Sequence, residues 1–474
     1  MKNKLVVLAT LAASMGLAAC GGGGGSKGKG EISLWVGAES VEFYQTVTKE
    51  YADSHADFGY TVKVVAADTG TVGGSMLADN TGCGDIVTIA HDNIGKLAQK
   101  TLVKPLTDAG LLAQIEADNP DEYKTVIKSK VGDSADKYVI GSPYISQALF
   151  LMYNKQYVSE EQAKSFEGLQ QAALALRTTK PEKMGDIYGC TLTGTDGYNF
   201  SFTLLARKSE DNSTTLKIYE GLDKSNTYCQ GDDTVSVARW GQDAFANGTL
   251  TWPNDSGYAT MMQTTTALAV IGGPWNYNKV KSAIGEANVG ISLIPEFTLT
   301  AAEVEGTTIP ANTKMRGGTF TDCKCFVINA ASEPAKYAAE QELIKFLSSK
   351  DVQNRSFKAC TNVPAYQGAM TYIENVKSEV SETAYAIAKA QSEMVTYGIA
   401  QPFVTATLNN YYYQAGAPDL YKNLLILDGT AEDASLRKVR EVLYTMEYIW
   451  KFGNGTVGSM VIPETLPAEP VKAS

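Results

Sequence analysis

Residues 142–155 read SPYISQALFLMYNK, and this stretch decides what kind of fold the chain can adopt. After Pro143 the sequence is mostly apolar from Tyr144 to Tyr153, a run longer than a common strand of about five or six residues. A run of this length can leave one sheet and enter another. It therefore predicts a strand that crosses between two sheets.

The segments before this crossing alternate between strand and helix patterns. Short apolar runs occur at Ile32–Val36, Tyr60–Val65 and Ile86–Ile89, and the stretch Val41–Tyr51 has the spacing of a helix. Alternation of this kind predicts an α/β fold.

The segments after the crossing repeat the alternation. A helix is expected over Glu160–Leu176 with Ser159 as its N-cap, and strands are expected over Ile187–Leu192, Ala267–Ile271 and Val289–Ile294.

The last third of the chain adds another crossing strand and two helices. Cys325–Asn329 is the second candidate for a crossing strand, and SEP at 332–334 supplies an N-cap and a first-turn proline for a helix that extends to Leu347. Leu436–Trp450 also has the pattern of a helix.

The N-terminus has the three parts of a bacterial lipoprotein signal. Lys2 and Lys4 give a positive start, residues 5–17 form an apolar run that is too short to span a bilayer, and LAAC ends at Cys20 as a cleavage site. The alternative interpretation is an ordinary secretory signal with a chance cysteine.

This pattern predicts where the mature protein is located. We expect residues 1–20 to be a signal peptide and Cys20 to carry lipid. Residues 21–30, which are rich in Gly, would be a flexible tether. The protein would then be lipid-anchored at the outer face of the cell membrane.

The composition is that of a globular protein and excludes some partners. The chain has 474 residues, a net charge of −11, 44% hydrophobic residues and 20% charged residues, which fits two or three domains with a large core. A negative chain is a poor partner for nucleic acid or for an anionic membrane surface, so membrane attachment would depend on the lipid. No second run of about 20 apolar residues is present to span a membrane.

Apart from Cys20, the chain has an even number of cysteines in an exported context that permits disulfides: Cys83, Cys190, Cys229, Cys323, Cys325 and Cys360. Cys323 and Cys325 lie two apart on one expected strand, where a bond between them would strain the backbone. Neither this pair nor the two histidines, His55 and His91, supports a metal site, and no cofactor is expected.

Five segments spread over most of the chain follow the order of a known family. They are the opening strand with Trp35, GDIVTIAHDNIGKLAQ at 84–99, SPYISQALFLMYNK at 142–155, IGGPWNY at 271–277 and VINAAS at 327–332. Together they resemble the sugar-binding subunits of ABC importers, extracellular solute-binding family 1, which includes the maltodextrin-binding proteins.

The resemblance implies a two-lobed α/β fold of the periplasmic-binding-protein type, with hinge strands and a ligand cleft between the lobes. The N-terminal lobe would comprise residues 31–145 and 329–371, and the C-terminal lobe residues 150–325 and 375–474. The implied function is that of a monomeric substrate-binding lipoprotein, not an enzyme, that captures maltooligosaccharide-like sugars and presents them to ABC permease subunits.

A sugar cleft needs carboxylates or amides beside aromatic planes, because sugars present hydroxyl groups and apolar ring faces. The resemblance assigns this role to Glu39, Ser40, Asp92, Asn93, Gln147, Asp196, Tyr198, Trp275, Tyr411 and Tyr412. Trp275 is the strongest candidate, because Gly-Gly-Pro-Trp is a turn that presents an aromatic ring at the end of a strand.

Four positions depart from the family's pattern. Ile89 stands where the family has tryptophan, Asn93 where it has arginine, Gln147 where it has glutamate and Ser40 where it has lysine. These substitutions reduce the polar groups available to a ligand, so the exact sugar and its chain length stay open.

The lobe arrangement that the resemblance implies suggests two disulfides. Cys190 is expected to pair with Cys229 in the C-terminal lobe. Cys360 is expected to pair with Cys323 or Cys325, because the resemblance brings its segment near the strand that enters the hinge.

Two other functions are compatible with some of these candidate residues. A binding protein for a peptide or a polyamine would also use acids and aromatics, although Asn93 and Gln147 favour a neutral, hydroxylated ligand. A tethered glycoside hydrolase would need paired carboxylates, for which Glu39 and Asp92 are candidates, but the resemblance is to proteins without catalysis. His91 is expected to be a structural hydrogen-bonding residue.

Overall fold

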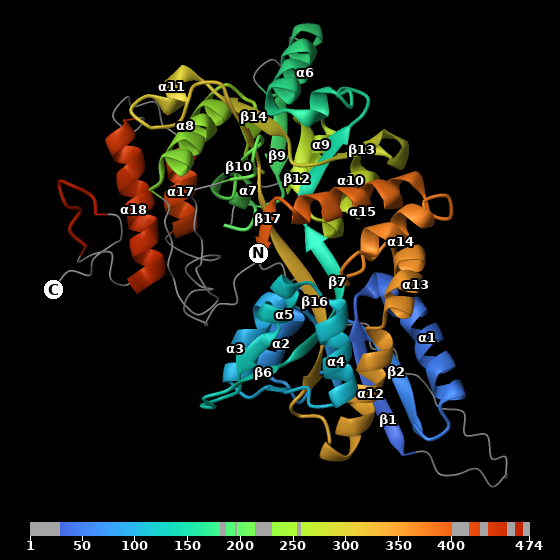
Figure 1. The fold of residues 1–474 in the computed structure, drawn as a ribbon. Coiled ribbons are helices and arrows are strands. Elements are labelled where there is room, and N and C mark those ends of the chain that lie inside the picture. The colour runs from blue at the N-terminus through green and yellow to red at the C-terminus, as the bar shows by residue number, and fades with distance from the viewer. Residues whose placement is uncertain are drawn as a thin grey trace, which may run out of the picture.

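The chain forms two α/β lobes, each built around its own sheet (Figure 1). The computed structural model describes residues 29–180, 186–194, 197–213, 230–253, 257–400, 417–426, 435–452 and 460–467. We call the lobe at the bottom of Figure 1 the first lobe and the one at the top the second lobe. The predicted signal peptide and Cys20 lie outside the described residues, and Gly30, the last residue of the predicted tether, already begins the first strand.

The first lobe contains a seven-stranded sheet with the order β17-β16-β3-β1-β2, in which β4 and β7 also pair with β16. β1 is parallel to β2 and β3, whereas β16 is antiparallel to β3 and β7. Alternate residues of β1, namely Ile32, Leu34 and Val36, are fully buried, as expected for one face of a strand. The strands are β1 (Gly30–Val36), β2 (Tyr60–Ala66), β3 (Ile86–Ala90), β4 (Val103–Lys104), β7 (Gly141–Ala148), β16 (Thr319–Asn329) and β17 (Gly398–Ala400).

Helices cover this sheet and bury their apolar stripes against it. On α1 the buried residues are Tyr44, Val47, Thr48 and Tyr51, which is the spacing of one helical face. The helices are α1 (Val41–Ser54), α2 (Val72–Ala78), α3 (Ile94–Gln99), α4 (Ala109–Asp118), α5 (Asp121–Val126), α12 (Tyr337–Leu347) and α13 (Lys350–Cys360), and a hairpin of β5 (Lys128–Lys130) and β6 (Lys137–Val139) lies beside them.

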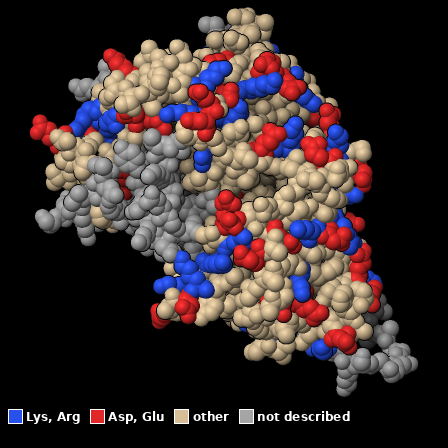
Figure 2. All heavy atoms as spheres, in the orientation of Figure 1, with Lys and Arg blue, Asp and Glu red and all other residues tan. Residues whose placement is uncertain are grey.

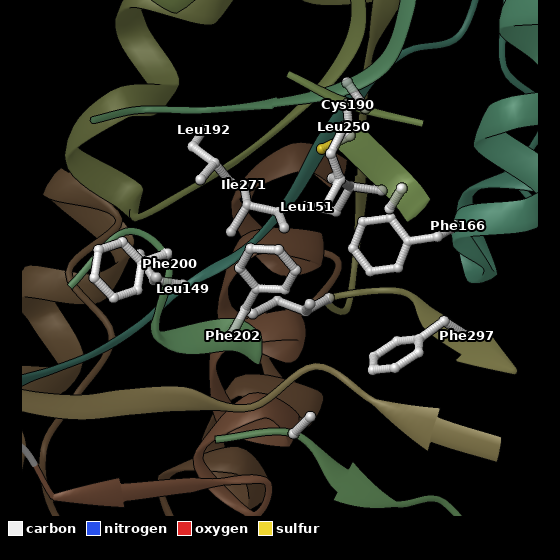
Figure 3. Close-up of a cluster of buried hydrophobic side chains, with 14 of the residues drawn as sticks. Leu149, Leu151, Phe166, Cys190, Leu192, Phe200, Phe202, Leu250, Ile271 and Phe297 are labelled. Carbon is white, nitrogen blue, oxygen red and sulfur yellow. The ribbon is translucent and has the colours of Figure 1, made fainter. Parts of the chain in front are cut away.

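The second lobe contains a five-stranded sheet with the order β11-β9-β12-β8-β13 and a three-stranded sheet with the order β10-β15-β14. Phe166, Phe202 and Phe297 pack in the core between them (Figure 3). The strands are β8 (Phe150–Asn154), β9 (Tyr188–Leu192), β10 (Arg207–Lys208), β11 (Leu250–Thr251), β12 (Ala267–Gly272), β13 (Val289–Ser292), β14 (Glu296–Leu299) and β15 (Thr313–Arg316).

The helices of the second lobe are α6 (Phe166–Thr179), α7 (Ser201–Leu204), α8 (Asp232–Ala246), α9 (Gly257–Gln263), α10 (Tyr277–Ile284), α11 (Ala301–Val304), α17 (Ala417–Leu425) and α18 (Leu436–Phe452). Two more helices, α14 (Ala369–Asn375) and α15 (Glu382–Val395), lie between the levels of the two sheets in Figure 1. None of the helices within the described residues combines the length and apolarity needed to cross a bilayer.

The predicted crossing run does pass from one sheet to the other, but as two strands. β7 belongs to the sheet of the first lobe, β8 belongs to the sheet of the second, and Leu149 separates them. Every residue of both strands is buried, which explains the uninterrupted apolar sequence.

Two helix starts differ from the prediction. α6 begins at Phe166 with Ser165 as its N-cap, whose Oγ accepts a hydrogen bond from the Gly168 amide at 3.0 Å. Ser159 instead accepts from the amide of Gln162 in a separate short turn. The helix predicted after residue 332 begins as a 3₁₀ turn and continues as α12.

Candidate ligand-binding cleft

Two adjoining cavities lie between the lobes. Their volumes are about 730 Å³ and 310 Å³. Both are lined by Asp68, Thr69, Gln147, Trp275 and Lys324, so they meet along these residues and form one cleft.

The strand order explains why the cleft forms here. In a doubly wound sheet, ligands bind outside the carboxyl ends of the parallel strands. In the first lobe these ends lead to the lining segments Gly37–Glu39 after β1, Asp68–Gly70 after β2 and Asp92–Asn93 after β3. In the second lobe, β12 leads to Trp275 in the same way.

The floor of the cleft is formed by the two crossing strands. Gln147 on β7 is paired in register with Asp322 on β16, and both line the smaller cavity. Nδ1 of the fully buried His91 lies 2.7 Å from Oδ1 of Asp322. His91 thus has the structural role expected from the sequence, because it fixes the orientation of a carboxylate on the floor.

Trp275 presents its ring to both cavities. Its side chain is 46% exposed, unlike the aromatic residues of the cores. A Cβ atom at Gly273 would lie 2.2 Å from the ring, so the indole can lie against the turn only because residue 273 is glycine. The Gly273 amide donates to Oδ1 of Asn276 at 3.0 Å, which holds the turn in shape.

Tyr198 continues the aromatic surface towards the floor. Its ring centroid lies 6.1 Å from that of Trp275 and 6.1 Å from that of Phe320 on β16. The three rings therefore connect the second lobe to the crossing strand.

The charged groups of the cleft are mostly acidic. Glu39 and Asp68 are exposed on the first lobe, and Asp92 accepts a hydrogen bond at 2.8 Å from the side-chain amide of Asn93. Burial lowers the pKa of Lys324, and the carboxylates of Glu39, Asp322 and Asp68, in that order, oppose this shift.

The larger cavity extends towards α15 and is lined there by uncharged polar side chains. Ser381, Thr383 and Gln391 contribute from this region, and Asn278 contributes from α10. Hydroxyl and amide groups can donate and accept hydrogen bonds, as a polyhydroxylated ligand requires.

Most of the predicted ligand residues line the cleft. Those present in its walls are Glu39, Asp92, Asn93, Gln147, Tyr198 and Trp275. Asp196, Tyr411 and Tyr412 lie outside the described residues.

Ser40, another predicted ligand residue, is buried and lines neither cavity. Its Oγ accepts a hydrogen bond at 3.1 Å from the side chain of Asn362, so it joins α1 to the segment after α13. Ile89 is fully buried in the core of the first lobe and offers no aromatic surface.

Sequence reasoning missed the residues that line the larger cavity near α10 and α15, and in the smaller cavity it missed the polar residues Asp68, Thr69, Asp322 and Lys324. A signal existed for the last two. Charged residues at alternate positions, separated by Cys323 and followed by apolar residues, indicate a buried strand with one polar face.

Neither predicted disulfide is present among the residues that the structure describes. Cys190, Cys323, Cys325 and Cys360 are free thiols, and Cys229 lies outside the described residues. Cys190 is enclosed in the core of the second lobe beside Leu250 (Figure 3). Burial raises the pKa of its thiol.

Cys323 and Cys325 both point into the core of the first lobe, with their Sγ atoms 3.7 Å apart. Cys360 instead lines the cleft. The pairing predicted for Cys360 failed because the strand turns both partner thiols away from the cleft.

The described residues contain no group of three or more His, Cys, Asp or Glu side chains placed to hold a metal ion. Figure 2 shows acidic and basic side chains interspersed over one face of the molecule, without a broad basic patch on that face.

Several solved structures of binding proteins have a similar fold. A maltodextrin-binding protein of L. casei BL23 without ligand matches with a TM-score of 0.67 at 17% identity, covering 88% of this chain and 98% of its own. The maltose-binding periplasmic protein of Listeria monocytogenes in complex with maltose matches with a TM-score of 0.63 at 18% identity, covering 89% and 98%. MalX from Streptococcus pneumoniae in complex with maltopentaose matches with a TM-score of 0.64 at 18% identity, covering 88% and 99%.

These likenesses establish the two-lobed fold that the sequence predicted. No curated protein sequence matches this chain. Residues 46–383, most of the chain, match the family described as bacterial extracellular solute-binding protein. The chain belongs to this family of extracellular solute-binding proteins.

Proposed function

We propose that the protein is the substrate-binding lipoprotein of a carbohydrate ABC importer and captures maltooligosaccharide-like sugars in the cleft. The observation that supports this most is the exposed ring of Trp275, which faces carboxylate and amide groups across the cleft. An aromatic plane beside hydrogen-bonding groups suits a sugar ring and its hydroxyls.

The proposal includes the division of the chain and its attachment. Residues 31–145 and 329–371 would form most of one lobe and residues 150–325 and 375–474 most of the other, although β16 and β17 pair within the sheet of the first lobe. Lipid on Cys20 would hold a monomer at the outer face of the cell membrane, where it meets the permease subunits. Maltose and maltopentaose are bound by two of the structural neighbours, which supports this ligand class.

A polyamine is less well supported as the ligand. A polycation needs several carboxylates without competing cations, but Lys324 and Lys281 line the same cleft as the acids. Hydrolysis is not proposed, because the family is one of binding proteins.

Calorimetry tests the proposal directly. Maltooligosaccharides should bind with micromolar affinity, about −8 kcal/mol at 1 μM, whereas glucose, amino acids and spermidine should give no heat. Absence of heat with a broad panel of oligosaccharides would refute the sugar assignment, and binding of spermidine alone would establish the rival.

A further inference from the structure

We propose that Lys324 binds the ligand directly, donating charge-assisted hydrogen bonds to uncharged sugar hydroxyls at the point where the two cavities meet. This inference rests on the proposed function and adds a specificity-determining residue to it.

The backbone of β16 directs Lys324 towards the ligand. Successive side chains of a strand point to opposite faces, and the two cysteines that flank Lys324 are fully buried in the core of the first lobe. Lys324 must therefore project to the other face, where it lines both cavities. The register between β16 and β7 also shifts between Lys324 and Cys325, an irregularity of the kind that re-aims side chains next to binding sites.

The ammonium group of Lys324 has no fixed partner in the part of the chain that the structure describes. It makes neither an ion pair nor a hydrogen bond there, although the carboxylates of Glu39, Asp322 and Asp68 lie near enough to favour its charged form. A charged amine with three N–H donors and no fixed acceptor is available to a ligand.

The other lysine of the cleft is a natural contrast. Lys281 also lines the larger cavity, but its Nζ lies 2.9 Å from Oε2 of Glu286. This ion pair already engages the charge of Lys281, so a ligand gains less from it.

The surrounding carboxylates indicate which ligands Lys324 accepts. A lone lysine in a cleft would attract an acidic sugar, but here Glu39, Asp68 and Asp92 line the same cleft and would repel a carboxylate on the ligand. Hydroxyl oxygens accept from the ammonium without this repulsion, so the arrangement favours neutral sugars over acidic ones.

Calorimetry with maltotetraose, at low ionic strength, tests the inference on the full mature chain. Lys324→Met should weaken binding ten-fold or more and leave the melting temperature of the ligand-free protein unchanged or higher, whereas Lys49→Met, at an exposed position on α1 outside the cleft, should leave the affinity unchanged. Wild-type affinity in Lys324→Met would overturn the inference alone. Absence of binding to the wild-type protein would overturn the proposed function and the inference with it.

Two further measurements use the wild-type protein and so do not depend on the folding of a variant. Maltotetraose should protect Lys324 from acetylation, read by mass spectrometry, while the exposed Lys49 stays equally reactive. The aldonic acid of maltotetraose should bind at least ten-fold more weakly than the sugar itself. Unprotected Lys324, or tighter binding of the acid, would contradict the inference.

Discussion

At the residue scale, the position of the Trp275 ring depends on the small residue beside it, Gly273. Gly273 leaves room for the indole to lie against its own turn, and the amide of that glycine is held by Asn276. The ring thus lies against a turn of defined shape while nearly half of its surface stays available. A preorganised ring loses little entropy when a sugar stacks on it.

Trp275→Ala should therefore weaken oligosaccharide binding by about ten-fold or more, because lost ring contact and apolar burial amount to about 1.5 to 3 kcal/mol. Calorimetry measures the affinity, and thermal unfolding without ligand should give nearly the wild-type melting temperature. Trp240→Ala is the control, since Trp240 stacks on Phe297 in the core and its loss should lower the melting temperature. A similar loss of stability in Trp275→Ala, with affinity unchanged, would assign Trp275 to the core.

The residues of the candidate site that could be predicted from the sequence are those placed by a local motif, such as a turn or the end of a strand. Trp275 follows a Gly-Gly-Pro turn, and Asp92 follows a strand, so both could be placed at strand ends. Ser40 could not be placed, because its orientation depends on Asn362, which is distant in the sequence. Lys324 was missed because a lysine within a crossing strand looks like an interruption of the apolar pattern.

At the scale of elements, the strands were easier to predict than the helix starts. β1, β2, β3 and β12 occur close to where their apolar runs predicted them, since burial on a sheet leaves a direct mark on the sequence. β16 is longer than predicted at its N-terminal end, because the polar face of the strand there interrupts the pattern. The start of α6 was misplaced because Ser159 and Ser165 are both competent caps, and packing decides between them.

Helix α12 carries a buried acid, Glu340, whose pKa differs from its ordinary value. Glu340 is completely buried, and its carboxylate accepts a hydrogen bond from the hydroxyl of Ser332. Burial raises the pKa of Glu340 to about 7, although Ser332 and nearby lysines act in the opposite direction. The folded state therefore holds a proton that the unfolded chain releases at lower pH.

The wild-type protein should lose stability as pH rises from the unfolded pKa of Glu340, about 4.3, to about 7, by a total on the order of 3 kcal/mol. Glu340→Gln has no carboxyl group to titrate at this position. The free energy of unfolding of this variant, relative to that of the wild type, should therefore rise over the same pH interval and level off above it. Urea unfolding at pH 5 and pH 8 measures the difference. Glu333→Gln, at an exposed position on the preceding turn, is the control. If Glu340→Gln and the wild type differ in free energy of unfolding by the same amount at pH 5 and pH 8, the prediction is wrong.

At the scale of the whole molecule, the cleft divides its binding groups between the lobes. Asp92 and Asn93 belong to the first lobe, Trp275 belongs to the second, and the crossing strands lie beneath both. A ligand that contacts both walls is bound more tightly when the walls approach each other, so it shifts the population towards a closed state.

Small-angle scattering should therefore show a smaller radius of gyration when maltotetraose is added. A protein lacking residues 21–28 should respond in the same way, because that segment precedes the folded lobes. An unchanged profile at saturating sugar, with binding verified by calorimetry, would mean that the cleft has its final shape before the ligand arrives.

The position of β16 also governs the order in which the molecule can assemble. Its partner β3 is complete by residue 90, yet the contact between His91 and Asp322 joins positions 231 residues apart. Contacts of such high sequence separation require closure of a long loop before they contribute, which slows folding. A nascent chain would display one unpaired edge of β3 until more than two thirds of the chain had been synthesised, so newly made protein depends on protection of that edge from other chains.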